Sequence, residues 1–316
     1  MELEFEKPLQ VIKEEIAALE EKRKNGDSVA ASDLAALKRK LKSEAAKIYG
    51  ELSSWETVQV ARHPGRPTFM DYAGVMCDEF IELHGDREFG DDRAIVGGMA
   101  RIGKVRFVLL GHRKGRTTEE NIESNFGMGA PEGYRKALRL MKLAEKYQIP
   151  VVTLVDTPGA FPGKEAEERG QAEAIARNLT EMAVLKTPIV VIVTGEGGSG
   201  GALGIAVGDR VLMLENAVYS VISPEGCASI LWRDGAKAPD AAKALKITSR
   251  DLAELKIIDD IIPEPVGGAH SDPKETMENV KAAILEQLSA LKKLALEKLL
   301  DRRYKKYASM GESEKS

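Results

Sequence analysis

Five glycines stand within the seven positions 195–201, directly after an apolar segment. Because glycine has no side chain, backbone N–H groups in such a segment can approach a ligand closely. A helix that begins there adds partial positive charge. Two N–H groups fixed in advance stabilise the negative charge that develops on oxygen during acyl transfer. The segment therefore predicts a backbone oxyanion site.

The same glycines fit two phosphate-binding patterns in part. Gly195, Gly197 and Gly200 satisfy G-x-G-x-x-G, and Glu215 follows at roughly the distance of a ribose-binding carboxylate. However, only about two helical turns fit between the glycines and the next strand, fewer than a βαβ crossover needs. No Gly-Lys-Ser/Thr follows, so a P-loop would lack its lysine. Both nucleotide interpretations are disfavoured.

A third pattern concerns Ser199, which stands between glycines as in the G-x-S-x-G nucleophile elbow. A serine hydrolase also needs a histidine base and an acidic partner. Of the four histidines, only His270 follows Ser199, and it lies in a loop without an obvious acidic partner. A hydrolase that uses Ser199 stays as the alternative function.

A second turn of similar type follows the apolar segment 151–155. It contains Thr157, Pro158 and Gly159. Because the carboxyl ends of parallel strands meet at one edge of an α/β sheet, both turns are expected to share a site. Ordinary turn chemistry is the simpler explanation for Pro158 and Gly159 taken alone.

Apolar strands alternate with helices around these turns, which predicts an α/β core over roughly 86–265 with a sheet buried on both faces. The expected strands are 94–100, 105–111, 151–155, 188–193, 211–214 and 219–222. The expected helices are 69–84, 131–147 and 165–185, and a final helix at 282–307.

The two ends of the chain differ from this core. Apolar spacing over 8–50, broken at Asn25, Gly26 and Asp27, predicts a helical hairpin. The basic run 302–306 is expected to form a solvated face. We therefore predict an N-terminal helical arm (1–54), one large domain (55–300) and a basic, frayed tail (301–316).

Composition excludes several classes of protein. The net charge of −4 and the aromatic content of 5% argue against nucleic-acid binding. Two cysteines without a C-x-x-C pair predict no zinc site in this chain. The sequence shows no signal peptide and no apolar run of about 18 residues, so a cytoplasmic protein outside the membrane is expected.

Six stretches together resemble the carboxyltransferase alpha subunit of bacterial acetyl-CoA carboxylase. They are 125–139 (NFGMGAPEGYRKALR), 156–160 (DTPGA), 167–171 (EERGQ), 195–203 (GEGGSGGAL), 219–232 (YSVISPEGCASILW) and 261–270 (IIPEPVGGAH). The resemblance spans nearly the whole chain. It implies a crotonase-like (ClpP/crotonase) α/β fold of ββα units, with an N-terminal helical arm and a C-terminal helix.

The resemblance also implies a reaction and its partners. Carboxyl would pass from carboxybiotin, held on the biotin carboxyl carrier protein and loaded by biotin carboxylase, to acetyl-CoA, giving malonyl-CoA for fatty acid synthesis. A beta subunit would bind the thioester side and carry the zinc, in an alpha2beta2 assembly. This chain alone should then be inactive, and a scaffold that only positions the beta subunit is a further alternative.

Site residues follow from matching the family's pattern. Its paired glycines, which hold the biotin side, correspond to Gly200 and Gly201, with Gly197, Gly198 and the turn at Thr157, Pro158 and Gly159 in support. No side-chain base is required, because the biotin anion can take the methyl proton itself. After the strand that ends near residue 111, Lys114 and Arg116 are weaker candidates for contact with CoA phosphates or the carrier.

Overall fold

A single mixed sheet organises the computed structural model, which describes residues 3–25 and 31–311. The described residues form eight strands in the order β1-β2-β3-β4-β5-β6-β8, and β7 pairs with β5. The strands are β1 (Glu79–Glu82), β2 (Ile95–Ile102), β3 (Val105–His112), β4 (Val151–Thr157), β5 (Ile189–Gly198), β6 (Arg210–Leu214), β7 (Val218–Ser220) and β8 (Asp260–Ile262). The β1–β2 and β2–β3 pairs are antiparallel, and all other pairs are parallel.

The central strands are buried because helices cover the sheet. Every residue of β5 is buried, and β4 is buried except at Asp156. Continuous runs of valine, leucine and isoleucine suit strands that are covered on both faces. Helix α6 (Pro131–Lys146) packs against β2 and β3, while α13 (Pro273–Leu291) contacts β5 and β8. The predicted strands and α6 are therefore confirmed, with small shifts at their ends, except that β5 continues five residues past its predicted end.

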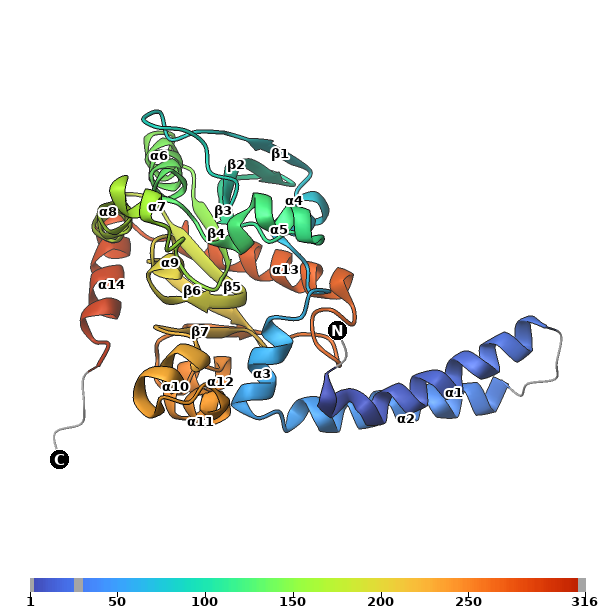
Figure 1. The fold of residues 1–316 in the computed structure, drawn as a ribbon. Coiled ribbons are helices and arrows are strands. Elements are labelled where there is room, and N and C mark those ends of the chain that lie inside the picture. The colour runs from blue at the N-terminus through green and yellow to red at the C-terminus, as the bar shows by residue number, and fades with distance from the viewer. Residues whose placement is uncertain (1–2, 26–30, 312–316) are drawn as a thin grey trace.

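The predicted helical arm is present as α1 (Lys7–Lys24) and α2 (Ala31–Gly50), preceded by a 3-10 turn at Glu4–Glu6. Figure 1 shows the pair extending away from the sheet. Ile12, Ile16 and Leu34 are buried between the two helices in a small cluster separate from the main core. Of the predicted break, Asn25 ends α1, and Gly26 and Asp27 lie outside the described residues.

Three predicted helices have the wrong extent. The first ends earlier, as α4 (Phe69–Met76), and β1 follows it. The second is two helices, α7 (Lys164–Glu168) and α8 (Gln171–Val184), because Gly170 adopts a left-handed conformation with φ of 84°. The third begins earlier and is divided into α13 and α14 (Leu296–Ala308).

The basic run near the C-terminus is not a solvated face throughout. Arg303 is only 1% exposed and its guanidinium donates to the carbonyl oxygens of Met182, Leu185 and Thr187. It also forms two hydrogen bonds with Asp209, which is buried. The expectation of a solvated run was wrong here, because these carbonyls need a donor. The boundary drawn at residue 301 consequently falls inside α14.

Shorter helices complete the described chain. They are α3 (Ser54–Ala61), α5 (Thr118–Glu123), α9 (Ser199–Leu203), α10 (Pro224–Trp232), α11 (Ala238–Leu245) and α12 (Ser249–Glu254), with 3-10 turns at Asn125–Gly127 and Gly235–Lys237. In the described part of the chain, no helix combines the length and the apolar character that a membrane crossing requires.

Candidate functional site

The glycine segment is a strand followed by a short helix, and not a turn throughout. Strand β5 continues to Gly198, and α9 begins at Ser199. The extension forms because β7 pairs with it, Gly197 opposite Tyr219 and Gly198 opposite Ser220. The prediction of one long turn was wrong on this point, since four of its seven residues belong to the sheet.

The two predicted turns lie against each other, as expected for neighbouring parallel strands. A Cβ atom built on Gly198 would stand 2.1 Å from the carbonyl oxygen of Pro158. One built on Gly201 would stand 2.2 Å from the backbone carbon of Gly159. Both distances are far shorter than any side chain tolerates. Glycine is therefore required at 198 and 201 so that the backbones of the two turns can touch.

Gly200 has a different environment. A Cβ atom there would lie 3.8 Å from its nearest neighbours, both atoms of Ile175, which is ordinary contact. Gly200 is half-buried, whereas Gly201 is buried. Outside regular helix and strand bonds, no backbone hydrogen bond in the described chain uses the N–H group of Gly200 or Gly201. The first N–H groups of a helix have no partner within it, so these two donors are free for a ligand.

The turn at Thr157 packs against the glycines. It offers a ligand fewer backbone N–H donors than its sequence suggests. The hydroxyl of Thr157 donates to the carbonyl oxygen of Gly159 at 2.6 Å and accepts from the Gly159 N–H at 3.2 Å. Pro158 has no N–H. The Gly159 donor is thus used inside the turn, and the role left for Thr157, Pro158 and Gly159 is to hold the shape of the backbone.

Ser199 lies at the junction of β5 and α9 with a left-handed φ of 53° and an exposed side chain. The recorded histidine contacts lie elsewhere. His63 and His270 stack with ring centroids 3.8 Å apart, and His84 bonds to Asp91. His112 is 1% exposed, and neither of its ring nitrogens has a hydrogen-bond partner among the described residues. The structure gives no support to a hydrolase based on Ser199.

Charged side chains form a network next to Gly195 and Glu196. Lys114 Nζ lies 2.7 Å from Asp156 Oδ1, which also accepts the backbone N–H of Glu196 at 2.9 Å. The carboxylate of Glu196 in turn binds Arg62, which reaches Glu225 at the start of α10. Asp156 occupies the space beside Gly195, where a Cβ atom would stand 2.5 Å from Oδ1. The network therefore fixes the carboxyl ends of β4 and β5 relative to α3 and α10.

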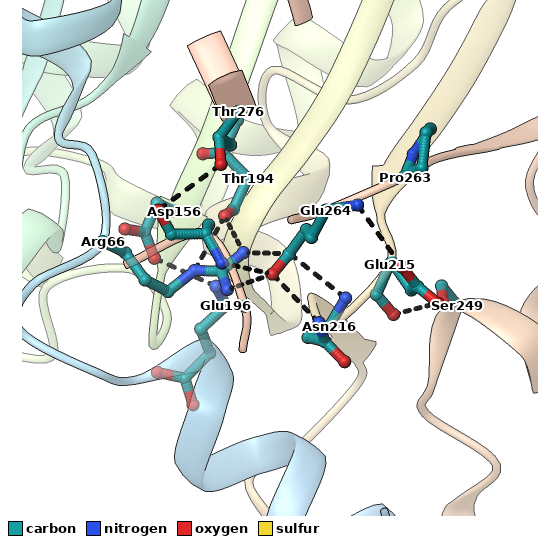
Figure 2. A network of polar contacts seen from close by, with 12 residues as sticks. Arg66, Asp156, Thr194, Glu196, Glu215, Asn216, Ser249, Pro263, Glu264 and Thr276 are labelled. Carbon is teal, nitrogen blue, oxygen red and sulfur yellow. Dashed lines mark hydrogen bonds and ion pairs between the residues drawn. The ribbon is translucent and has the colours of Figure 1, made fainter. Parts of the chain in front are cut away.

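A second ion pair lies deeper, as Figure 2 shows. Arg66 and Glu264 have side chains 4% and 0% exposed and are joined at 2.6 Å. Arg66 also donates to the carbonyl oxygen of Thr194, and Glu264 accepts from Asn216 and from the N–H of Ala269. Burial alone would raise the pKa of Glu264, but the Arg66 guanidinium outweighs it and holds that pKa below its usual value.

Of the two cationic candidates, Lys114 is near the glycines through Asp156, and Arg116 is more remote. Arg116 is about half exposed and pairs with Asp71 at the start of α4. Sequence reasoning missed Arg62, Arg66 and Glu196 as part of this region. The available signal was Glu196 itself, because a carboxylate inside a buried strand requires a cationic partner.

An apolar cavity of about 330 Å³ opens beside the glycines. Its lining includes Ser199 and Leu203 of α9 together with Tyr219, Ser220 and Val221. An apolar cavity with a few polar groups is the usual form of a small-molecule site. The cavity can therefore hold an apolar ring system next to α9, and it meets the glycine segment at Ser199 and Leu203, since neither Gly200 nor Gly201 lines it.

Comparison with known proteins agrees with this geometry. Residues 2–311 match the family described as acetyl co-enzyme A carboxylase carboxyltransferase-like. The chain is 54% identical over 311 residues to a protein of Geobacter metallireducens, with 98% of this chain and 97% of that protein covered. It is 54% identical over 310 residues to one of Xanthomonas oryzae pv. oryzae, with the same coverage. Both are named acetyl-coenzyme A carboxylase carboxyl transferase subunit alpha.

Solved structures show the same fold at low sequence identity. Transcarboxylase 12S has a TM-score of 0.58 at 19% identity, covering 74% of this chain and 44% of that one. The beta subunit of Pseudomonas aeruginosa geranyl-CoA carboxylase has a TM-score of 0.56 at 17% identity, covering 78% and 46%. The chain spans less than half of either structure. The predicted α/β, crotonase-like fold class is confirmed, and the chain belongs to the family of acetyl-CoA carboxylase carboxyltransferase alpha subunits.

Proposed function

We propose that this chain is the half of a carboxyltransferase that binds biotin and moves a carboxyl group to acetyl-CoA, giving malonyl-CoA. The observation that carries the proposal is the start of α9 at Ser199, which places the N–H groups of Gly200 and Gly201 in the first helical turn, where they have no partner within the helix. An apolar cavity adjoins α9 at Ser199 and Leu203. Membership of the family supports the reaction. Free donors and an apolar wall fit biotin, which combines a polar ureido group with an apolar ring and arm.

Biotin supplies a carboxyl group on its ureido nitrogen and, after transfer, a negatively charged ureido oxygen. The chain's part is to bind and stabilise that oxygen through the N–H groups of Gly200 and Gly201. Because these donors are fixed before the reaction, they need no reorganisation when the charge develops. The missing side chain at Gly200 lets the oxygen reach the backbone, whereas the one at Gly201 makes room for the backbone of Gly159. The turn at Thr157 and the strand glycines 197 and 198 hold this backbone in place.

The proposal includes partners that complete the reaction. A beta subunit binds the thioester of acetyl-CoA and carries the zinc, in an alpha2beta2 assembly. The biotin carboxyl carrier protein delivers carboxybiotin, which biotin carboxylase prepares. Lys114 and Arg116 are assigned to contact with the carrier or CoA phosphates, with Arg116 the more accessible of the two. Such a chain works in the cytoplasm.

Gly200→Ala tests the oxyanion assignment. The added methyl group fits within the folded chain, but it would occupy the space through which a ligand oxygen approaches the backbone. In complex with the beta subunit, the variant should lose roughly 100-fold or more in the rate of malonyl-CoA decarboxylation with free biotin. Gly201→Ala is a poorer test, since its methyl group would meet the backbone of Gly159 and disturb the fold.

The matched control is Gly74→Ala on α4, where no heavy atom lies within 4 Å of the added Cβ. It should keep full activity. Assembly with the beta subunit, measured by size-exclusion chromatography, should be normal for both variants. A Gly200→Ala complex with wild-type rate would contradict the oxyanion assignment and favour a chain that only positions the beta subunit.

A further inference from the structure

The carbonyl side of the Gly200–Gly201 backbone is held by a buried tyrosine. Tyr134, on α6, is fully buried, and its hydroxyl donates to the carbonyl oxygen of Gly201 at 3.2 Å. Burial raises the pKa of Tyr134, so its phenol remains a proton donor throughout the neutral range. A Cβ atom on Gly204 would stand 2.6 Å from the ring, so the tyrosine packs directly on the end of α9.

Asn178, on α8, completes this support from the other side. It is 1% exposed, and its Nδ2 atom donates to the carbonyl oxygen of Gly204 at 2.9 Å and to that of Tyr134 at 3.0 Å. One amide thus ties α6, α8 and the end of α9 together. Two carbonyl oxygens of the short segment, at 201 and 204, receive hydrogen bonds from side chains of the core.

These hydrogen bonds from Tyr134 and Asn178 matter because α9 is too short to be a stable helix by itself. It has five residues, two of them glycine, and a third glycine follows it at 204. Glycine lowers helix stability, and isolated helices of this length do not form. Tyr134 and Asn178 therefore act on the donors through the backbone of this one turn. Gly204, whose carbonyl Asn178 holds, donates its own N–H to the carbonyl oxygen of Gly200 at 2.9 Å, and that carbonyl lies in the same planar peptide group as the N–H of Gly201.

We propose that Tyr134 and Asn178 are positioning residues for carboxyl transfer, which act by aiming the N–H groups of Gly200 and Gly201 at the substrate oxygen. This inference rests on the proposed function. It means that two buried side chains influence the rate of the reaction, although neither touches the ligand. Removing either should change how well the transition state is stabilised more than how well acetyl-CoA or malonyl-CoA is bound.

Tyr134→Phe is the first test, because it removes one hydrogen bond and keeps the ring against Gly204. In complex with the beta subunit, kcat for malonyl-CoA decarboxylation with biotin should fall about 3–10-fold, the effect of losing one hydrogen bond. The KM for malonyl-CoA should not change. Asn178→Ala is the second test, which leaves the phenol in place, and it should also lower kcat at unchanged KM.

The double variant should be less impaired than the product of the two single effects, because both side chains act on one segment. Tyr49→Phe is the matched control. Its hydroxyl donates to Glu6 Oε1 at 2.8 Å at the base of the arm, so the variant loses a tyrosine hydrogen bond at least as strong as that of Tyr134 and outside α9. Its kcat should equal that of the unchanged chain, even where its melting temperature falls as much as that of Tyr134→Phe.

Two outcomes overturn the inference and differ from failure of the proposed function. Wild-type kcat in Tyr134→Phe and Asn178→Ala, together with an inactive Gly200→Ala, means that the glycines act without this support. Equal losses of kcat in Tyr134→Phe and Tyr49→Phe mean that the effect is general destabilisation. Full activity of Gly200→Ala would instead remove the oxyanion assignment itself.

Discussion

At the scale of single residues, the glycines divide by what stands opposite their missing side chains. Gly195 makes room for the carboxylate of Asp156, and Gly198 and Gly201 make room for the backbone of the Thr157 turn. Gly200 alone faces ordinary space. Gly197 makes room for the ring of Tyr219, so four of the five glycines serve the fold and Gly200 serves the approach of a ligand, which is why substitution at Gly200 separates function from folding.

His112 should give the protein a distinct acid sensitivity. Burial lowers its pKa to about 4, so in the folded chain it stays neutral while an unfolded chain protonates it below about 6.5. The unfolded state then binds more protons, and stability should fall as the pH drops from about 6.5 toward 4. By pH 5 the loss from His112 is on the order of 2 kcal/mol.

His112→Gln should remove this part of the pH dependence. Urea midpoints of both chains at pH 7.5 and pH 5 measure it, because the difference between the chains cancels all other titrating groups. An equal loss of stability in both chains at pH 5 would show that His112 is not neutral in the folded state.

Sequence and structure agree unevenly at this scale. Gly200 and Gly201 could be predicted because the residues themselves carry the pattern. Glu196 and its partner Arg62 could not be paired, since 134 residues separate them and only the fold brings them together. The different roles of the glycines could not be predicted either, because they depend on which atoms lie opposite each missing side chain.

At the scale of elements, Arg303 makes the largest set of polar contacts between α14 and the sheet, beside Lys306 and Tyr307. Arg303 satisfies three carbonyl oxygens and the carboxylate of Asp209, which also accepts the N–H of Ile189 at the start of β5. These contacts join the end of α8, the start of β5 and the loop before β6. A charge that is buried among carbonyls cannot be replaced by an apolar side chain without leaving them unpaired.

Arg303→Met should therefore destabilise the chain by about 3–5 kcal/mol, since Asp209 would remain buried without its cation. Denaturation in urea measures the loss. The adjacent, exposed Arg302 provides the control, and Arg302→Met should stay within about 0.5 kcal/mol of the unchanged chain. Similar stability in the two variants would contradict the role given to Arg303.

Element boundaries show where sequence patterns reach their limit. Strands β4 and β5 were predictable because their apolar runs are continuous. The extension of β5 through residues 195–198 was not, because glycines carry no pattern and the strand is defined by pairing with β7 and with Thr157 of β4. The break at Gly170 had a signal in the glycine itself, whereas no glycine or proline marks the end of α13 at Leu291.

At the scale of the whole molecule, the chain combines a sheet-centred body with an arm that has little core of its own. The cluster of Ile12, Ile16 and Leu34 is separate from the main core, while a second small cluster at Leu9 and Tyr49 joins the arm to the body. Segments with few buried contacts open locally at free energies well below that of global unfolding.

Hydrogen exchange should accordingly distinguish the two parts in the isolated chain. Amides of α1 and α2 should exchange faster than those of β4 and β5 when deuterium uptake is followed by mass spectrometry. Ile16→Ala should accelerate exchange in α1 and α2 and leave β5 unchanged, because the arm cluster shares no residue with the main core. Equal protection of arm and sheet would show instead that the chain opens as one unit.

The position of Arg303 in the sequence also determines when, during synthesis, its contacts with the sheet can form. It lies 116 residues after Thr187, whose carbonyl oxygen it binds. At about 5–20 residues per second, a ribosome needs about 6–23 s to make the intervening chain. For that time β4 and β5 exist without the donor that satisfies the backbone beside them. The backbone at the start of β5 is thus satisfied only after α14 has been made, so the nascent chain needs this helix to complete the contacts around the sheet.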